Sequence, residues 1–388
     1  MKILFIGPNI FRGHGVDSIH ERAIINTLRD TNVTVWVISL LCSKKIIPAF
    51  KNSIKDKDIF LPIFAPICLY PIAYAAGGLL LGLLVAVLKL ANRKICDVVY
   101  IRNPLVAAGF LFFKNLIAVP IIVKTPTLDS VELKDFYDCN PMFISVAEKI
   151  EKTAFEKADS VFVSSPSLRE HLMNRYCVSQ EKIKLIPIGV DYHSFAPSVR
   201  EHGCTVGYVG SYAPFQGIEY LIKAMAVVRQ KMPSARLLLV GCRTRTLEEL
   251  RDHLKLTNSI SFLDNVAHAE VPKIMDKIDI FVISRPKLNV NQIATPLKLL
   301  EALVAAKAIV ASDVEGINWI IKDGENGLLV KPEDVNELAN AIIELLSDKK
   351  LRRKLSCAAR ETAFIYDWKT VVLKILEEIN NTCIAAVH

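Results

Sequence analysis

The sequence lacks the patterns of several common protein classes. Its nine cysteines are scattered and form no C-x-x-C pair, which argues for a reducing compartment and against a zinc site or a disulfide framework. No two histidines have the spacing of metal ligands. The net charge of +8 favours anionic partners, but no basic stretch is interleaved with aromatic residues. Phosphate groups and anionic membrane surfaces therefore fit the chain better than nucleic acid does.

The length and composition indicate a globular protein with two domains. The chain has 388 residues, 52% of them hydrophobic and 23% charged, which suffices for two cores. The apolar start of the chain is too short for a signal peptide and is interrupted by Gly7 and Pro8, so we expect a first strand there. Short apolar runs at residues 3–6, 33–38, 97–101 and 120–124 alternate with helical patterns. This alternation predicts an α/β fold with a doubly wound parallel sheet.

A glycine-rich loop follows the first predicted strand, before a helix expected at residues 17–28. Gly13 and Gly15 flank His14, and with Ser18 they nearly spell a dinucleotide-binding fingerprint. Ser18 replaces the third glycine, however, and the strand at residues 33–38 is not followed by an acidic residue to bind a ribose, so NAD is not expected. A D-x-D sequence at residues 56–58 lies in a Lys/Asp-rich run typical of a solvated loop, so no metal site is expected either.

Residues 59–88 contain no charged side chain. The length of this stretch would allow a transmembrane helix, but a single crossing would separate strands that should share one sheet. Prolines and the Gly77-Gly78 pair also divide it into shorter pieces. A membrane-docking helix lying in the plane of the bilayer, a buried core helix and a re-entrant or spanning segment remain open, and docking is favoured.

Residues 291–316 carry the pattern most suggestive of a binding site. Thr295 can cap a helix and Pro296 fits its first position, which places Lys298 and Glu301 on one face near the helix N-terminus. Free N–H groups and a cation suit a phosphate, and a carboxylate can accept hydrogen bonds from ribose hydroxyls. An exposed salt bridge is the plainer interpretation of a Lys/Glu pair at this spacing.

This segment and the sequence DGENGLLVKPEDVNELANAI at residues 323–342 resemble the group 1, or family 4, retaining glycosyltransferases of GT-B fold. The stretch ADSVFVSS at residues 158–165 and KLIPIGVD at residues 184–191 resemble the end of the first domain in that family. The resemblance implies two Rossmann-like domains facing across a cleft. It implies a first domain at residues 1–198 on the acceptor and membrane side, a nucleotide-sugar-binding domain at 199–365, and a C-terminal helix at 366–388 that packs back on the first domain.

The resemblance also implies site residues. Ser211 and Gln216 stand near the places of an arginine and a lysine that commonly bind the donor diphosphate, and no histidine follows the strand at residues 120–124. Arg243, Arg245 and Arg285 follow strands and could supply the cations, although solvated surface arginines would look the same. The implied catalytic set is Lys298, Glu301 and Arg285; the donor-binding set is Ser211, Gln216, Arg243, Arg245, Val266, Thr295, Pro296 and Leu297; and the acceptor set is Gly13, His14, Gly15 and Asp129. Asp129 is equally well explained as a turn residue.

The function implied is metal-independent transfer of a sugar, of hexosyl type, from a nucleotide-diphosphate-sugar to a hydroxyl acceptor with retention. UDP or GDP donors are expected, with no cofactor, and the acceptor would be a lipid-linked or cell-surface glycan precursor. The expected location is the cytoplasmic face of the cell membrane. Ile293 replaces a frequent glutamate, and with Gln216 and the missing histidine it motivates an alternative, a silent GT-B-like partner of a membrane glycosyltransferase. A sugar-nucleotide epimerase of GT-B fold is a further alternative.

Overall fold

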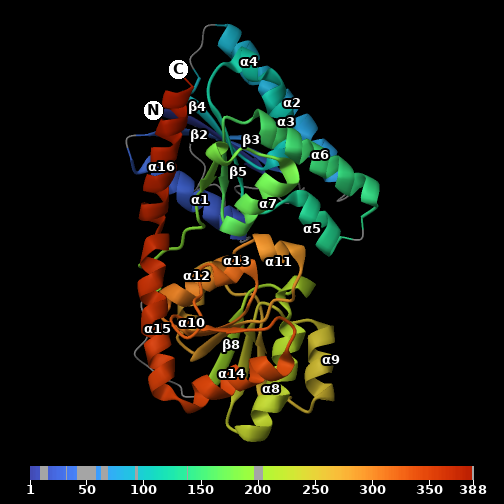
Figure 1. The fold of residues 1–388 in the computed structure, drawn as a ribbon, viewed down its shortest axis with the longest axis vertical. Helices are drawn as coiled ribbons and strands as arrows, with labels where there is room; N and C mark the ends of the chain where they lie inside the picture. Colours follow the sequence, from blue (N-terminus) through green and yellow to red (C-terminus); the bar gives the residue numbers. More distant parts are fainter. Residues whose placement is uncertain are drawn as a thin grey trace. The chain divides into compact units, whose positions relative to one another are not determined.

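The protein is described here from a computed structural model that covers residues 1–8, 16–31, 33–41, 58–62, 69–91, 95–137, 139–195 and 204–386. The chain forms two compact units (Figure 1). The first contains Met1–Ile188 and Trp368–His388, and the second contains Gly189–Asp367. Each unit is described by itself below.

The first unit is built on a seven-stranded parallel sheet with strand order β3-β2-β1-β4-β5-β6-β7. The central strands β4 and β5 are buried along their whole length, and their apolar runs are typical of parallel strands covered on both faces. The strands are β1 Lys2–Pro8, β2 Thr34–Leu41, β3 Asp58–Pro62, β4 Val98–Arg102, β5 Ile121–Thr125, β6 Ser160–Val163 and β7 Ile183–Leu185.

Helices cover both faces of this sheet (Figure 1). On one face α1 and the C-terminal helix α16 pack together, and Ile24, Val371 and Ile375 join the core of the sheet there. On the other face α2 packs along α3, which contacts α6. The helices are α1 Val16–Arg29, α2 Tyr70–Leu90, α3 Pro104–Phe110, η3 Leu111–Phe113, α4 Lys114–Ile117, α5 Asp129–Phe136, α6 Pro141–Lys157, α7 Pro166–Tyr176 and α16 Trp368–Ala385.

The contact between α2 and α3 depends on glycines. A methyl group on Gly78 would overlap the carbonyl oxygen of Val106, and one on Gly109 would overlap the carbonyl oxygen of Ala75. The two helices therefore meet backbone to backbone, which only glycine permits. Because β1, β2 and β4 share one sheet and α2 connects β3 to β4, the topological argument against a single membrane crossing is confirmed.

The second unit repeats the same plan with six parallel strands in the order β10-β9-β8-β11-β12-β13. The strands are β8 Thr205–Val209, β9 Arg236–Val240, β10 Ile260–Leu263, β11 Ile280–Ile283, β12 Ala308–Ser312 and β13 Leu328–Val330. The helices are η5 Pro214–Gln216, α8 Ile218–Lys231, α9 Arg245–His253, η6 His268–Glu270, α10 Val271–Met275, α11 Asn289–Ile293, α12 Leu297–Val304, α13 Glu315–Asn318, α14 Val335–Ser347, α15 Lys349–Ala363 and η7 Phe364–Tyr366.

The predicted α/β fold is confirmed, since both sheets have the 3-2-1-4-5-6 order of Rossmann-like domains. The division between the units, after Ile188, falls before the boundary expected at residues 198–199. Two contacts account for it. Val190 pairs with Asp367, and the Phe195 carbonyl accepts a hydrogen bond from Arg360, so this segment belongs with the second unit. The local sequence pattern does not indicate these long-range contacts.

Candidate functional site

The strand order of the second unit locates a candidate site. Open parallel sheets bind ligands beyond the carboxyl ends of the strands, at the point where the strand order reverses. That point lies between the adjacent strands β8 and β11. Gly210 and Ser211 follow β8, Ser284 and Arg285 follow β11, and α12 contributes Lys298 and Glu301. The residues singled out from the sequence at 285, 298 and 301 therefore come from elements at the reversal point or close to it.

Lys298 contacts strand β8 and the connection that follows it. Its Nζ lies 2.5 Å from the Tyr208 hydroxyl and 2.9 Å from Gln216 Oε1, and it stands 4.5 Å from the centre of the Tyr208 ring. A Cβ atom at Gly210 would lie 2.8 Å from the same nitrogen, so the glycine leaves room for the lysine. The structure thus brings Gln216 together with Lys298. Tyr208 was not predicted, because its strand pattern only marks it as a core residue.

Arg285 is buried next to this group. Its Nη1 donates to the Ala294 carbonyl at 3.3 Å, and its guanidinium lies 5.5 Å from the centre of the Phe215 ring. Its Nε is buried with no hydrogen-bond partner in the part of the chain that the structure describes. Phe215 is the residue before Gln216, so the arginine and the lysine both contact the β8–α8 connection.

Neither cation has a carboxylate partner. Among the described residues, no Asp or Glu oxygen lies within ion-pair distance of Lys298 or Arg285. Burial lowers the pKa of Lys298 well below its usual value, and the nearby Arg285 lowers it further. Burial also lowers the pKa of Arg285 to about 10. The site therefore holds two desolvated positive groups that an anion would stabilise.

Glu301 has a different partner. Its Oε1 lies 2.8 Å from His268 Nε2, and its side chain is 10% exposed. His268 opens η6, in the segment that follows β10. His268 was not predicted, although Val266, which was expected to bind the donor, lies half-buried two residues before it.

The start of α12 differs from the prediction. The helix begins at Leu297, the N-cap is Pro296, and no side chain caps it. Thr295 does not cap the helix as expected, because it lies one residue before the N-cap; its Oγ1 accepts a hydrogen bond of 2.9 Å from Trp319 Nε1. The first N–H groups of a helix lack intrahelical acceptors, and here no side chain satisfies them through a cap.

Of three other predicted donor residues, two make contacts away from Lys298 and the third, Ser211, shares the Tyr208 hydroxyl with it. Arg243 donates to the Phe262 carbonyl at 2.8 Å and lies 3.4 Å from Asp264, so its charge is already partnered. Arg245 opens α9 with 90% of its side chain exposed and pairs with Glu249 at 2.7 Å, as a solvated surface arginine would. Ser211 is exposed, and its carbonyl accepts from the Tyr208 hydroxyl at 3.2 Å.

The predicted acceptor residues belong to the first unit. Gly13, His14 and Gly15 lie outside the described residues. Asp129 opens α5 just beyond β5, where it accepts hydrogen bonds from the Tyr70 hydroxyl at 3.0 Å and from Asn103 Nδ2 at 2.9 Å. It is therefore the first residue of a helix and not a turn residue, and it ties the starts of α2 and α3 to α5.

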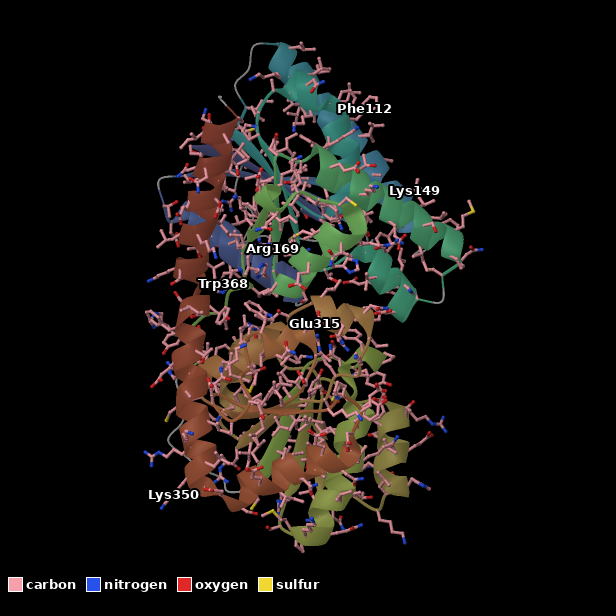
Figure 2. All side chains as sticks on the ribbon, in the orientation of Figure 1. Phe112, Lys149, Arg169, Glu315, Lys350 and Trp368 are labelled. Carbon is pink, nitrogen blue, oxygen red and sulfur yellow. The ribbon has the colours of Figure 1, made fainter. Side chains whose placement is uncertain are left out.

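A buried group of charges lies at the carboxyl ends of β4 and β5. Arg102 Nε is 2.7 Å from Glu21, Lys124 Nζ is 3.9 Å from the same carboxylate, and Lys124 Nζ is 2.6 Å from His20 Nε2. Trp368, labelled in Figure 2 at the start of α16, lies 4.8 Å from the His20 ring. Burial lowers the pKa of His20 well below its usual value, and Lys124 and Arg102 add to the effect, so the imidazole is neutral and accepts from Lys124.

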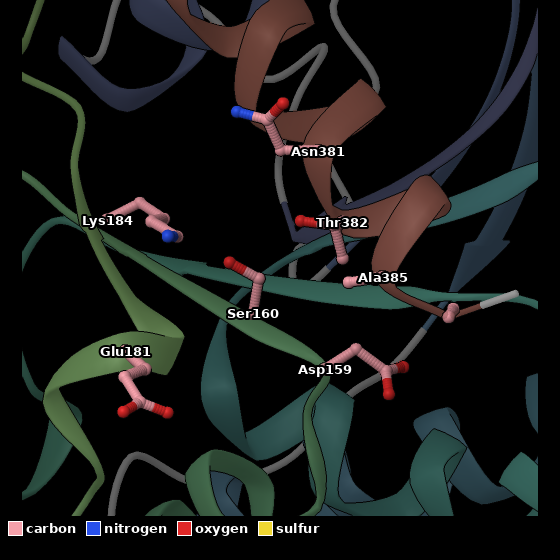
Figure 3. Close-up of a pocket in the computed structure, with 8 residues that line it drawn as sticks. Asp159, Ser160, Glu181, Lys184, Asn381, Thr382 and Ala385 are labelled. Carbon is pink, nitrogen blue, oxygen red and sulfur yellow. The ribbon is translucent and has the colours of Figure 1, made fainter. Parts of the chain in front are cut away.

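A cavity of about 230 Å³ lies elsewhere in the first unit (Figure 3). Its lining includes Asp159, Ser160 and Lys184 from the strand side and Asn381 and Thr382 from α16. Ser160 is the first residue of β6, so this cavity is at the amino ends of the strands, away from the edge where parallel sheets bind ligands. We do not assign it to the site.

One face of α2 is apolar and exposed. Its inward face is buried, whereas Ile72, Leu79, Leu80, Leu83, Leu84, Val87 and Leu90 are each more than 40% exposed, as are Phe112 and Leu116 beside it (Figure 2). By length and composition α2 could cross a membrane, but this is weak evidence, since 44% of its most apolar window is buried within the protein.

Comparison with solved structures defines the class of protein. The fold matches a sucrose-phosphate synthase from Thermosynechococcus elongatus with a TM-score of 0.80 at 20% identity, covering 99% of each chain. It matches HepE of Anabaena, determined in complex with UDP, with a TM-score of 0.76 at 20% identity, covering 98% of this chain and 100% of that one. The protein has the GT-B fold of two Rossmann-like domains, as the sequence predicted.

Comparison of sequences then adds a family match. Residues 203–348, which lie almost entirely in the second unit, match the model of the group 1 glycosyl transferases. A phosphatidyl-myo-inositol mannosyltransferase of Mycolicibacterium smegmatis is 31% identical over 198 residues, which are 49% of this chain and 50% of that protein. A D-inositol 3-phosphate glycosyltransferase of Corynebacterium glutamicum is 26% identical over 294 residues, 70% of this chain and 69% of that protein. The chain thus spans about half the length of several curated relatives that it matches.

Proposed function

We propose that the protein transfers a sugar from a nucleotide-diphosphate-sugar to a hydroxyl acceptor, with retention. The observation that carries the proposal is the pair of buried cations, Lys298 and Arg285, with no carboxylate within ion-pair distance in the described part of the chain. They stand at the strand reversal point of a group 1 domain. A diphosphate would provide the negative charge that these groups lack.

The reaction assigns a role to each group. Cleavage of the sugar–phosphate bond leaves negative charge on the diphosphate, so catalysis needs preorganised cations and N–H donors. Lys298 and Arg285 supply the cations, and the N–H groups at the start of α12, near Thr295, Pro296 and Leu297, supply donors. Glu301 accepts hydrogen bonds from the ribose, and Ser211, Gln216 and Val266 line the donor site. The proton of the acceptor passes to a donor phosphate oxygen, and neither a metal nor a cofactor is required.

The acceptor is proposed to be lipid-linked. One relative is named for phosphatidyl-myo-inositol, a lipid, and another for D-inositol 3-phosphate, which carries no lipid but shares the inositol hydroxyls and a phosphate. Asp129 and the loop containing Gly13, His14 and Gly15 are proposed to contact the acceptor. Asp129 lies just beyond β5, at the carboxyl edge of the first sheet, and residues 13–15 come after β1 in the sequence.

The exposed face of α2 is proposed to bind the cytoplasmic surface of the cell membrane. The helix carries no acidic residue, and its last turn contains Lys89. An apolar face with a cation beside it fits an anionic bilayer better than it fits water. The scattered cysteines agree with a reducing compartment.

Calorimetric titration with UDP, GDP and ADP, without added metal, tests the donor site. We expect one nucleotide to bind with micromolar affinity and Glu301→Ala to weaken it by more than about tenfold, since hydrogen bonds to charged groups contribute about 1.5–3 kcal/mol. Unchanged affinity in Glu301→Ala would remove the ribose assignment. Binding without donor hydrolysis or transfer would favour a silent partner, and a product that is an isomer of the donor would favour an epimerase.

Liposome flotation tests the membrane surface. The double variant Leu83→Asp, Leu84→Asp places two carboxylates on the exposed face of α2 and should abolish flotation with anionic vesicles. Leu373→Asp is a matched control, because Leu373 is 63% exposed on α16, which packs against α1. Equal flotation of the double variant and the control would contradict membrane docking.

A further inference from the structure

Glu301 is held by one side chain. Its Oε1 bonds to His268 Nε2 at 2.8 Å, a distance typical of a hydrogen bond to a charged group. In the part of the chain that the structure describes, no other side chain donates to this carboxylate. His268 therefore occupies one oxygen and leaves Oε2 available to a ligand.

The histidine is itself held in place. It opens η6, where the Glu270 carboxylate accepts a hydrogen bond of 3.1 Å from the Ala267 N–H and closes the turn around His268. The segment before it is tied by Arg243, which donates to the Phe262 carbonyl and pairs with Asp264. The imidazole thus reaches Glu301 from a segment that is held in place by its own hydrogen bonds and ion pair.

An isolated glutamate would not present a fixed surface to a ligand. It has three side-chain torsions, and the last of them is broad, so the carboxylate plane of a free glutamate is poorly defined. Fixing Oε1 restricts that plane and directs Oε2. A pair of vicinal hydroxyls, as in a ribose, needs a carboxylate of fixed orientation for both hydrogen bonds to form.

We infer that His268 is a positioning residue that orients the Glu301 carboxylate for the ribose hydroxyls of the donor nucleotide. The inference rests on the proposed function, because it takes Glu301 as the ribose-binding group. His268 acts through Glu301, since its Nε2 is bonded to the carboxylate. Discrimination between a ribonucleotide and its 2′-deoxy counterpart should therefore depend on a residue that touches neither sugar hydroxyl.

The experiment is a calorimetric cycle of two ligands and several full-length proteins. The ligands are UDP and 2′-deoxy-UDP, or the GDP or ADP pair when that nucleotide is the one the unmodified protein binds. The variants are His268→Ala and His268→Gln, whose amide can still donate to Glu301. His253→Ala makes the same substitution at an exposed histidine of the same unit and serves as the control.

The unmodified protein and His253→Ala should bind the ribonucleotide at least about tenfold more tightly than the deoxy form, as expected from hydrogen bonds to a charged acceptor. In His268→Ala the ratio should fall to about threefold or less, with the affinity for the deoxynucleotide changed by less than about threefold. His268→Gln should restore most of the ratio. If His268→Ala fails to fold, His268→Asn, whose amide is too short to reach Glu301, takes its place.

The other outcomes overturn the inference in distinguishable ways. An unchanged ratio in His268→Ala, with discrimination intact in the unmodified protein, contradicts the positioning role alone. Tighter ribonucleotide binding in His268→Ala would show that the histidine competes with the ribose for Glu301. Absence of discrimination in the unmodified protein removes the ribose assignment of Glu301, and absence of nucleotide binding removes the proposed function itself.

Discussion

The two Rossmann-like units each place a lysine, an arginine, a glutamate and a histidine at the carboxyl edge of the sheet, but they pair them differently. In the first unit Arg102 contacts Glu21 directly and Lys124 contacts the neutral His20. In the second unit the glutamate pairs with His268, while the contacts of Lys298 among the described residues are a tyrosine hydroxyl and ring and an amide oxygen. In the first group Glu21 pairs with both cations, whereas in the second the cations are left to a ligand.

This difference separates stability from binding. A buried charge whose partner is removed is strongly destabilising, whereas replacing a buried charge that lacks a partner by an apolar side chain relieves a desolvation cost. Substitutions that look alike in the two units should therefore have opposite effects.

The largest effect is expected at Arg102. Arg102→Met removes the cation 2.7 Å from the fully buried Glu21 carboxylate and should lower the free energy of unfolding by about 3–5 kcal/mol. Arg285→Met is the matched substitution in the second unit and should leave the stability of the unliganded protein unchanged or raise it. Denaturant unfolding of both variants measures the contrast, and equal destabilisation would contradict it.

A second buried carboxylate of the first unit should be sensitive to pH. Glu151 accepts hydrogen bonds from Ser130 and Tyr176, and burial, with the nearby Asp129, raises its pKa to about 7. The folded state therefore binds this proton more tightly, so the contribution of Glu151 to stability is fully present below pH 4.5 and is lost as pH rises through about 7, by about 3 kcal/mol. In Glu151→Gln this decline should be absent when unfolding is measured at pH 5 and pH 7.5. Parallel pH profiles of the two proteins would show that Glu151 is not the source of the decline.

Removing the lysine of the second unit should affect binding and not folding. Lys298→Met removes a charge-assisted contact worth about 1.5–3 kcal/mol, so nucleotide affinity should fall by roughly 10-fold to 150-fold. Because the unliganded protein carries this cation at a desolvation cost, its melting temperature should stay the same or rise. Calorimetry and thermal unfolding on one preparation test both parts, and a lower melting temperature would count against an uncompensated cation.

The smallest effect is expected at Arg245, a predicted donor residue. Its side chain is 90% exposed and pairs with Glu249 four residues along α9. Arg245→Ala should change stability by less than about 0.5 kcal/mol and leave nucleotide affinity unchanged. A tenfold loss of affinity in the same titration would show that Arg245 contributes to donor binding.

Local patterns predicted the fold well. The strands Val98–Arg102 and Ile121–Thr125 are found where the apolar runs at residues 97–101 and 120–124 placed them, because a buried parallel strand leaves a continuous run in the sequence. The lysine and glutamate of α12 were also predicted, since their spacing is set by the helix.

Contacts between distant residues were out of reach of such patterns. His268 and Glu301 are 33 residues apart, and His20 and Lys124 are 104 apart. Thr295 has the chemistry of a helix cap, but its hydroxyl oxygen instead accepts a hydrogen bond from the indole N–H of Trp319. Tertiary contacts of this kind override local preference, and they also determine which charges are neutralised.

The glycine contact between α2 and α3 also bears on how the protein would find its acceptor. Since the two backbones touch at Gly78 and Gly109, the exposed face of α2 cannot move independently of the layer behind it. A bilayer that held this face would hold the first sheet at one fixed tilt. The search for a lipid-borne acceptor would then take place by lateral diffusion in two dimensions, with the orientation of the first domain already set.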